Sequence, residues 1–83
     1  MITIITKSYC PYCSWAKQFL ESIGKDFKEI EVSNDQETYE KYQEISGMKT
    51  VPQIFNGEAK LENLIGGYDE MMTKFKSGNL FNS

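Results

Sequence analysis

Two cysteines, Cys10 and Cys13, stand where an extended segment gives way to a helical pattern. Residues 2–6 are mostly β-branched and indicate a buried strand, whereas apolar side chains recur at helical spacing after residue 11. Pro11 suits the first position of a helix, which makes Cys10 the predicted N-cap residue. Any fold for this chain must therefore present the cysteine pair at a junction between a strand and a helix.

The cysteine count narrows the chemistry of this pair. The chain has two cysteines and no histidine. A disulfide scaffold normally has four or more cysteines, and a tetrahedral zinc site needs four ligands. Redox chemistry is therefore the favoured interpretation, and a pair of ordinary core cysteines is the alternative.

The expected position of Cys10 favours an ionised sulfur. At the N-cap, the sulfur would face the unpaired N–H groups and the positive end of the helix dipole, and Lys7 adds a positive charge nearby. We therefore expect Cys10 to be a thiolate at neutral pH and the attacking nucleophile. Cys13, one turn into the helix, is expected to be more buried, closer to an ordinary thiol, and able to reach Cys10 as the resolving thiol.

The remaining sequence alternates strand and helix patterns. After a first helix that begins at Pro11 and ends before Gly24, the predicted elements are a strand over 27–32, a helix over 35–46 capped by Ser33 or Asn34, a strand over 50–55, an Asn56-Gly57 turn, a strand over 61–65 and a helix over 69–77. The order is β-α-β-α-β-β-α, with the first two strands parallel across a right-handed crossover and the last two antiparallel. The spacing of Trp15, Met71 and Met72 favours places in the core.

Length and charge exclude several classes of function. The 83 residues fit a single domain, 1–83, and the net charge of −3 argues against a nucleic-acid partner. The N-terminus lacks the pattern of a signal peptide, and no apolar stretch approaches the length of about 20 residues that crosses a bilayer. We therefore expect a cytoplasmic protein with no membrane partner.

Four segments together resemble the glutaredoxins of the dithiol, CPYC type: Thr6-Lys7, Cys10-Pro11-Tyr12-Cys13, Thr50-Val51-Pro52 and Gly66-Gly67-Tyr68-Asp69. The resemblance covers essentially the whole chain. It implies an α/β protein with a thioredoxin-like fold, in which helices flank a four-stranded mixed sheet. Thioredoxins share this fold but usually carry a Trp-Cys-Gly-Pro-Cys motif.

The resemblance also implies roles for individual residues. Cys10 and Cys13 would be catalytic, and glutathione would be bound by Lys7, Tyr12, Thr50, Val51, Pro52, Gly67, Tyr68 and Asp69. A cis Val51–Pro52 bond would present the Val51 backbone to glutathione as an added strand. The N–H groups of Tyr68 and Asp69 would receive the γ-glutamyl carboxylate, and Lys7 and Tyr12 would flank the glycine end. Tyr39 stands where many members of the family have Gln or Arg.

The implied function is glutathione-dependent thiol–disulfide exchange on glutathionylated proteins and protein disulfides. Glutathione would be a cosubstrate, with no bound cofactor and no metal, and the protein would act as a monomer. One alternative is a thioredoxin-like reductase driven by a reductase protein. The other is a carrier in which two chains and two glutathiones hold a [2Fe–2S] cluster through Cys10, although Pro11 should stiffen the loop against it.

Overall fold

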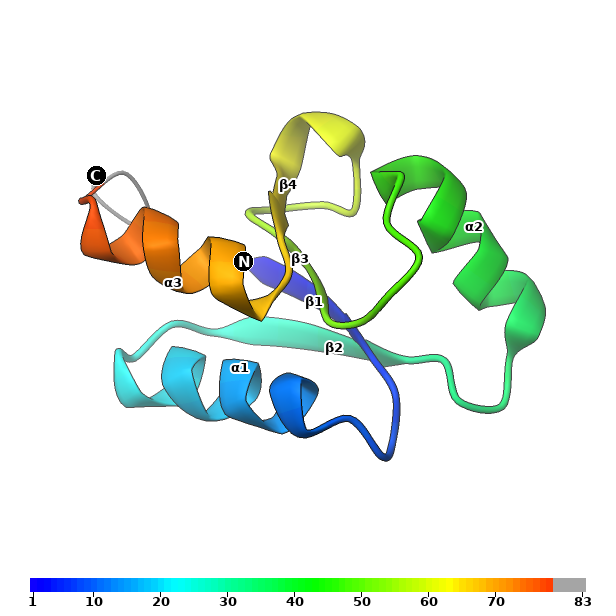
Figure 1. The fold of residues 1–83 in the computed structure, drawn as a ribbon, viewed down its shortest axis with the longest axis horizontal. Helices are drawn as coiled ribbons and strands as arrows, with labels where there is room; N and C mark the ends of the chain where they lie inside the picture. The colour runs from blue at the N-terminus through cyan, green and yellow to red at the C-terminus, as the bar shows by residue number, and fades with distance from the viewer. Residues whose placement is uncertain (79–83) are drawn as a thin grey trace.

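The computed structural model describes residues 1–78 and has the predicted order of elements (Figure 1). The strands are β1 (Ile2–Thr6), β2 (Phe27–Glu31), β3 (Gln53–Phe55) and β4 (Leu64–Gly66). The helices are α1 (Pro11–Ser22), α2 (Gln36–Ser46) and α3 (Tyr68–Lys76), with a short 3₁₀ helix, η1 (Leu61–Asn63), before β4. No helix within residues 1–78 combines the length and the apolar character needed to span a membrane.

The four strands form one mixed sheet in the order β2-β1-β3-β4. β1 runs parallel to β2 and antiparallel to β3, and β3 runs antiparallel to β4. All five residues of β1 are buried, as expected for an inner strand that is covered on both faces. The predicted mixed sheet and its strand directions are therefore confirmed.

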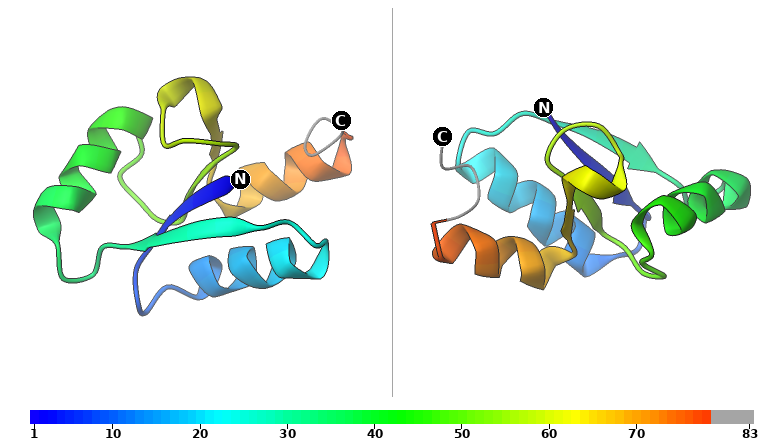
Figure 2. Two further views of the ribbon diagram at one scale, coloured as in Figure 1. Left: turned by 180° about the vertical axis from the view of Figure 1, so that it is seen from behind. Right: turned by 90° about the horizontal axis from the view of Figure 1, so that it is seen from above.

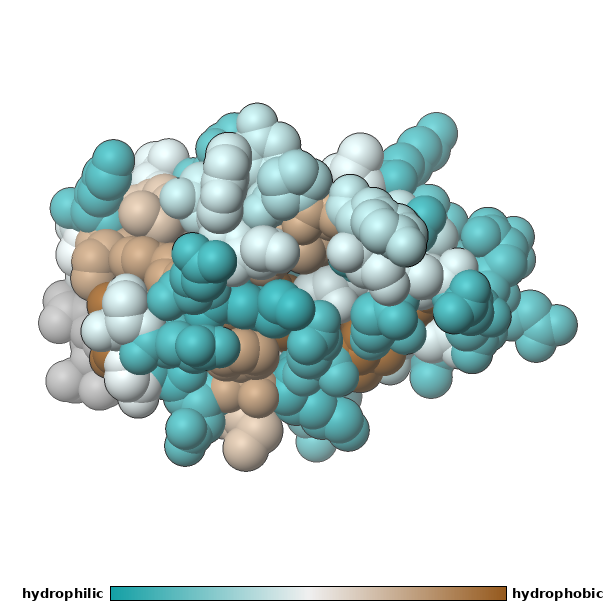
Figure 3. All heavy atoms as spheres, turned by 90° about the horizontal axis from the view of Figure 1, so that it is seen from below, coloured by the Kyte–Doolittle hydropathy of each residue, from teal (hydrophilic) through white to brown (hydrophobic). Residues whose placement is uncertain are grey.

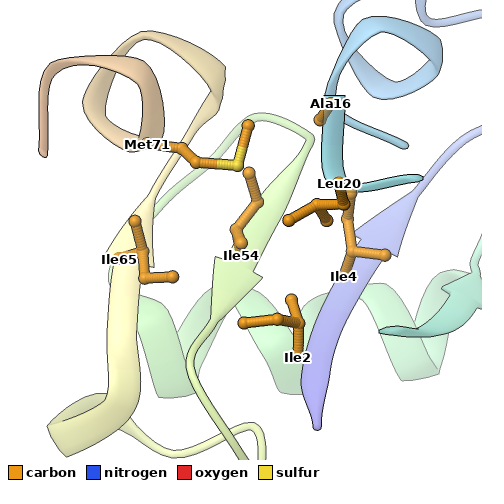
Figure 4. Close-up of a cluster of buried hydrophobic side chains, with 7 residues drawn as sticks. All are labelled: Ile2, Ile4, Ala16, Leu20, Ile54, Ile65 and Met71. Carbon is orange, nitrogen blue, oxygen red and sulfur yellow. The ribbon is translucent and has the colours of Figure 1, made fainter. Parts of the chain in front are cut away.

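Helices cover both faces of the sheet (Figure 2). β1 contributes alternate side chains to the two buried clusters on these faces. Ile2 and Ile4 point to the side of α1 and α3, and Ile5 points to the side of α2. On the first side, the buried side chains of β1, β3, β4, α1 and α3 meet around a common centre, with Met71 reaching Ile54 (Figure 4). This packing fixes the C-terminal end of β1, where the cysteine segment begins.

The second helix begins at Gln36, one residue later than predicted. Asp35 is the N-cap residue of α2, and its carboxylate accepts hydrogen bonds from the Thr38 N–H and hydroxyl at 3.1 and 2.6 Å. Ser33 is engaged elsewhere, because its hydroxyl accepts a hydrogen bond from the Ser8 N–H at 2.7 Å. The prediction of Ser33 or Asn34 as the cap was therefore wrong.

The last two strands are shorter than predicted. β3 begins at Gln53 rather than at residue 50, because the carbonyls of Met48 and Thr50 accept hydrogen bonds from the Gln53 side chain and the loop stays outside the sheet. β4 begins at Leu64, because residues 61–63 form η1 instead of a strand. Residues 56–63 therefore form a loop closed by the Asn56 N–H to Asn63 carbonyl bond of 2.8 Å, not a tight Asn56-Gly57 turn.

Trp15 lies at the surface, which corrects its predicted place in the core. Its side chain is 49% exposed, whereas the adjacent Ala16 is fully buried. Met71 is fully buried and Met72 is half-buried against the same cluster, as predicted. Figure 3 shows the face of the molecule that points down in Figure 1. On this face, hydrophilic side chains separate the hydrophobic residues into small patches.

A partly buried ion pair links α1 to β2. Glu29 accepts hydrogen bonds from the Thr6 hydroxyl at 2.6 Å and from the Lys17 ammonium at 3.0 Å. The Thr6 hydroxyl, and then Lys17, hold the pKa of Glu29 below its ordinary value. The ionised carboxylate therefore stabilises the fold at neutral pH and loses this effect as the pH falls through the lowered pKa.

Glu29→Gln is expected to lower the free energy of unfolding by about 0.5–1 kcal/mol at neutral pH, since water reaches both side chains. The difference from wild type should persist above about pH 5 and shrink to nothing in more acidic buffer, where wild-type Glu29 is also neutral. Urea unfolding at several pH values measures it. Glu21→Gln is the control, because Glu21 has no ion pair among residues 1–78. A difference that stays constant with pH would contradict this account.

Candidate functional site

Cys10 is the N-cap residue of α1, as the sequence predicts, and Pro11 occupies the first helical position. The Cys10 sulfur accepts a hydrogen bond from the Cys13 N–H at 3.3 Å, in place of the usual side-chain oxygen. The Cys10 carbonyl also accepts bonds from the N–H groups of Cys13 and Ser14. The sulfur thus lies at the positive end of the helix, in an environment that favours an anion.

Cys13 has a different environment on the inner side of the helix. Its side chain is 1% exposed, whereas that of Cys10 is half-exposed, and both thiols are free. Burial and the neighbouring Cys10 raise the pKa of Cys13 to about 12. At neutral pH Cys13 is therefore a protonated thiol. Its pKa lies further above that of an ordinary thiol than the sequence analysis predicts.

Beside the cysteines lies a hollow of about 280 Å³ between α1, the loop before β3 and the start of α3. It is lined by Tyr12, Met48, Thr50, Val51, Pro52, Gly67, Tyr68, Asp69 and Glu70. The Val51–Pro52 bond is cis, as the resemblance implies. The Cys10 thiol donates to the Val51 carbonyl at 3.7 Å, and the Val51 N–H has no partner within residues 1–78. One backbone segment therefore runs past the Cys10 sulfur with an unpaired N–H group.

The loop before β3 is held from inside by Gln53, which is fully buried. The Gln53 amide group donates to the carbonyls of Met48 and Thr50, both at 3.2 Å, and its carbonyl oxygen accepts from the Ser46 hydroxyl at 2.9 Å. The Ser46 hydroxyl in turn accepts from the Met48 N–H at 3.0 Å. This network fixes the wall of the hollow that carries Thr50 and Val51.

The opposite wall is the first turn of α3, whose N-cap residue is Gly67. The Gly67 N–H donates to the Glu70 carboxylate at 3.0 Å, while the N–H groups of Tyr68 and Asp69 have no partner within residues 1–78. Gly66 has φ +125°, and a Cβ there would lie 2.7 Å from the Glu70 Cβ. Only glycine fits at that point, and the turn presents two free donors at a helix N-terminus, a favourable place for a carboxylate.

A second hollow, of about 550 Å³, adjoins the first on the other side of Val51. It is lined by Lys7, Tyr9, Cys10, Pro11, Ser33, Asn34 and Val51. The Lys7 ammonium lies over the ring of Tyr39, 4.1 Å from the ring centre. Cys10 therefore has hollows on both sides, one of them with a fixed positive charge.

The structure brings the predicted glutathione-binding residues together in these two hollows. Seven of them line the first, while Lys7 lies with Cys10 in the second. Sequence reasoning missed Met48 and Glu70, which also line the first hollow. Glu70 carried a usable signal, because an acidic residue three positions after a helix cap often bonds back to the cap N–H. The place of Met48 depends on the course of the loop, which no local pattern shows.

Trp15 belongs to an aromatic group beside the first hollow. The ring centres of Tyr12, Trp15 and Tyr68 lie 5.1 to 6.0 Å apart, in edge-on and tilted arrangements. These geometries are favourable for aromatic pairs. Trp15 therefore braces Tyr12, which lines the hollow, against the start of α3, and this contact explains an exposed tryptophan.

Comparisons with known proteins agree with this geometry. The family model described as Glutaredoxin matches residues 2–60. Glutaredoxin 1 of Rickettsia prowazekii is 44% identical over 82 residues, covering 95% of this chain and 81% of that protein. A glutaredoxin of Neisseria meningitidis serogroup A is 35% identical over 80 residues, covering 95% and 89%. A crystal structure of a buckwheat glutaredoxin–glutathione complex matches with a TM-score of 0.83 and 30% identity, covering 95% of this chain and 71% of that one.

Proposed function

The chain belongs to the glutaredoxin family and is therefore a thiol–disulfide oxidoreductase, and we propose that it uses glutathione as its reductant. The observation that carries this proposal is the position of Cys10, a half-buried residue at a helix N-terminus beside a hollow with unpaired backbone N–H groups on two walls. The similar buckwheat protein was solved with glutathione. Substrates would be glutathionylated proteins and protein disulfides, in a compartment with a reduced glutathione pool such as the cytoplasm.

The first reaction is the removal of glutathione from a protein thiol. The Cys10 thiolate attacks the glutathione sulfur of the mixed disulfide, so that a Cys10–glutathione disulfide forms and the protein sulfur leaves as a thiolate that takes up a proton. The thiolate of a second glutathione then attacks the glutathione sulfur attached to Cys10. Oxidised glutathione leaves, and the Cys10 thiolate is restored. A sulfur that is stable as an anion serves both steps, as attacker and then as leaving group.

Protein disulfides take a second route through Cys13. Cys10 attacks one sulfur of the substrate disulfide, and the other sulfur leaves as a thiolate. Cys13 then loses its proton and attacks Cys10, which forms a Cys10–Cys13 disulfide and releases the second substrate sulfur as a thiolate. Two glutathiones reduce this disulfide and leave as oxidised glutathione. The raised pKa of Cys13 keeps its thiol protonated and therefore out of the first step.

The unpaired N–H groups on the two walls of the first hollow suggest how glutathione would lie. Its cysteine backbone would pair with Val51 in the manner of an added strand, and its γ-glutamyl carboxylate would receive the N–H groups of Tyr68 and Asp69. The Asp69 carboxylate would accept the ligand ammonium. At the glycine end, the carboxylate would meet Lys7, with Tyr12 alongside. Apart from the Val51 carbonyl, which accepts a hydrogen bond from the Cys10 thiol, each contact uses a group with no hydrogen-bond or ion-pair partner among the described residues.

Enzyme coupling tests this proposal. With a glutathionylated peptide as substrate, we expect NADPH oxidation when glutathione and glutathione reductase are supplied, and none when thioredoxin reductase replaces both. The reverse pattern would instead support the thioredoxin-like alternative. Visible absorbance after anaerobic purification would favour the [2Fe–2S] carrier.

A further inference from the structure

Lys7 has an unusual partner for a lysine beside a reactive sulfur. Its ammonium lies 4.1 Å above the centre of the Tyr39 ring, and the ion pairs found within residues 1–78 do not include it. The Tyr39 ring cannot move aside, because it is 6% exposed and packed among Ile5, Val32 and Phe55. A rigid ring face therefore holds a flexible charged side chain at one place.

The other end of Tyr39 reaches the opposite side of the site. The Tyr39 hydroxyl donates to the Lys49 carbonyl at 2.9 Å. Lys49 directly precedes Thr50 and Val51, which line the first hollow. One side chain of α2 thus contacts both the segment before Cys10 and the loop on the far side of the sulfur.

We propose that Tyr39 is a positioning residue, whose ring face holds the Lys7 ammonium where the glycine carboxylate of glutathione arrives. This inference rests on the proposed function. Lysine has several rotatable bonds, and fixing them on binding costs conformational entropy. An ammonium that already lies on a ring loses less freedom when it meets the carboxylate. The ring also leaves the charge unneutralised, whereas a carboxylate partner would compete with the ligand.

The test compares glutathione with its glycine ethyl ester, in which the carboxylate that Lys7 would meet is esterified and uncharged. The measured quantity is the ratio of kcat/KM for the two thiols in the second step. This ratio does not depend on how much of a variant is correctly folded. We expect wild type to prefer glutathione and Tyr39→Leu to reduce that preference about three- to tenfold, as the loss of a partly buried cation–π contact implies.

Five further proteins separate the ring from other contributions. Tyr39→Phe keeps the ring, and we expect it to keep the preference. Pentafluorophenylalanine at position 39 keeps the size but removes the negative ring face, so it should lose the preference as the leucine variant does. Lys7→Gln should also lose it, with no further loss when combined with Tyr39→Leu. Tyr42→Leu is the matched control: Tyr42 also lies on α2 under a lysine, Lys41, but in a hollow away from Cys10.

The outcomes are distinct. If wild type fails to use glutathione at all, the proposed function falls. If wild type prefers glutathione over the ester and the leucine and pentafluorophenylalanine proteins do so equally well, Tyr39 is only a core residue and the inference is overturned. An equal loss in Tyr39→Phe also overturns it, since the hydroxyl bond to Lys49 would then be responsible.

Discussion

Cys10→Ser is expected to lower deglutathionylation of a peptide by at least about a thousandfold, because it removes the nucleophile of both routes. Cys13→Ser should keep this activity within about threefold, since the exchange of glutathione through Cys10 does not need a second thiol. With a protein disulfide as substrate, both variants should fail. Steady-state rates on the two substrates, measured with glutathione and glutathione reductase, give the comparison.

The two serine variants are a matched pair, since each replaces one sulfur with one oxygen. Thermal unfolding shows whether either change disturbs the fold, which is a real concern for the buried Cys13. An equal loss of deglutathionylation in two folded variants would mean that the reaction needs both thiols. A Cys13→Ser variant that still turns over protein disulfides would remove the resolving role from Cys13.

Much of the fold was predictable because local patterns and tertiary packing agree. The β-branched run of β1 forms a strand that is buried on both faces, and Ala16 and Leu20 of the apolar pattern in α1 are buried as expected, although Trp15 is not. The errors arose where several local solutions were equally good. Ser33, Asn34 and Asp35 are all favourable caps, and the hydrogen bond between the Ser8 N–H and the Ser33 hydroxyl removes Ser33 from that choice.

The site was predictable only in part, because its contacts join distant segments. Cys10 at the N-cap follows from Pro11 and the strand before it. The exposed position of Trp15 depends on Tyr68 from α3, and the place of Lys7 depends on Tyr39 from α2. A helical pattern shows which face of one helix is apolar, but not which partner that face meets. Residues between helices, or between a helix and a loop, are therefore the hardest to assign.

The start of β3 illustrates the same limit and leads to the second large effect. Thr50 and Val51 favour a strand by composition, yet the buried Gln53 side chain binds the carbonyl of Thr50 and keeps this segment as a loop. In Gln53→Met, the methionine side chain has nearly the same length as glutamine. It cannot form the three hydrogen bonds to Ser46, Met48 and Thr50. We expect it to lower the free energy of unfolding by about 2–4 kcal/mol, because buried polar groups lose their partners.

The same change should reach the chemistry, because the Gln53 network fixes the loop that would pair with glutathione. KM for glutathione should rise severalfold, and kcat for a small disulfide should change less, since Cys10 and α1 lie outside the network. Urea unfolding and steady-state kinetics measure the two effects. Gln43→Met is the matched control: Gln43 also donates to this loop, at 3.5 Å to the Lys49 carbonyl, but from a half-exposed position. We expect it to change stability by no more than about 0.5 kcal/mol. Equal effects of the two substitutions would show that burial of the Gln53 amide is not what holds the loop.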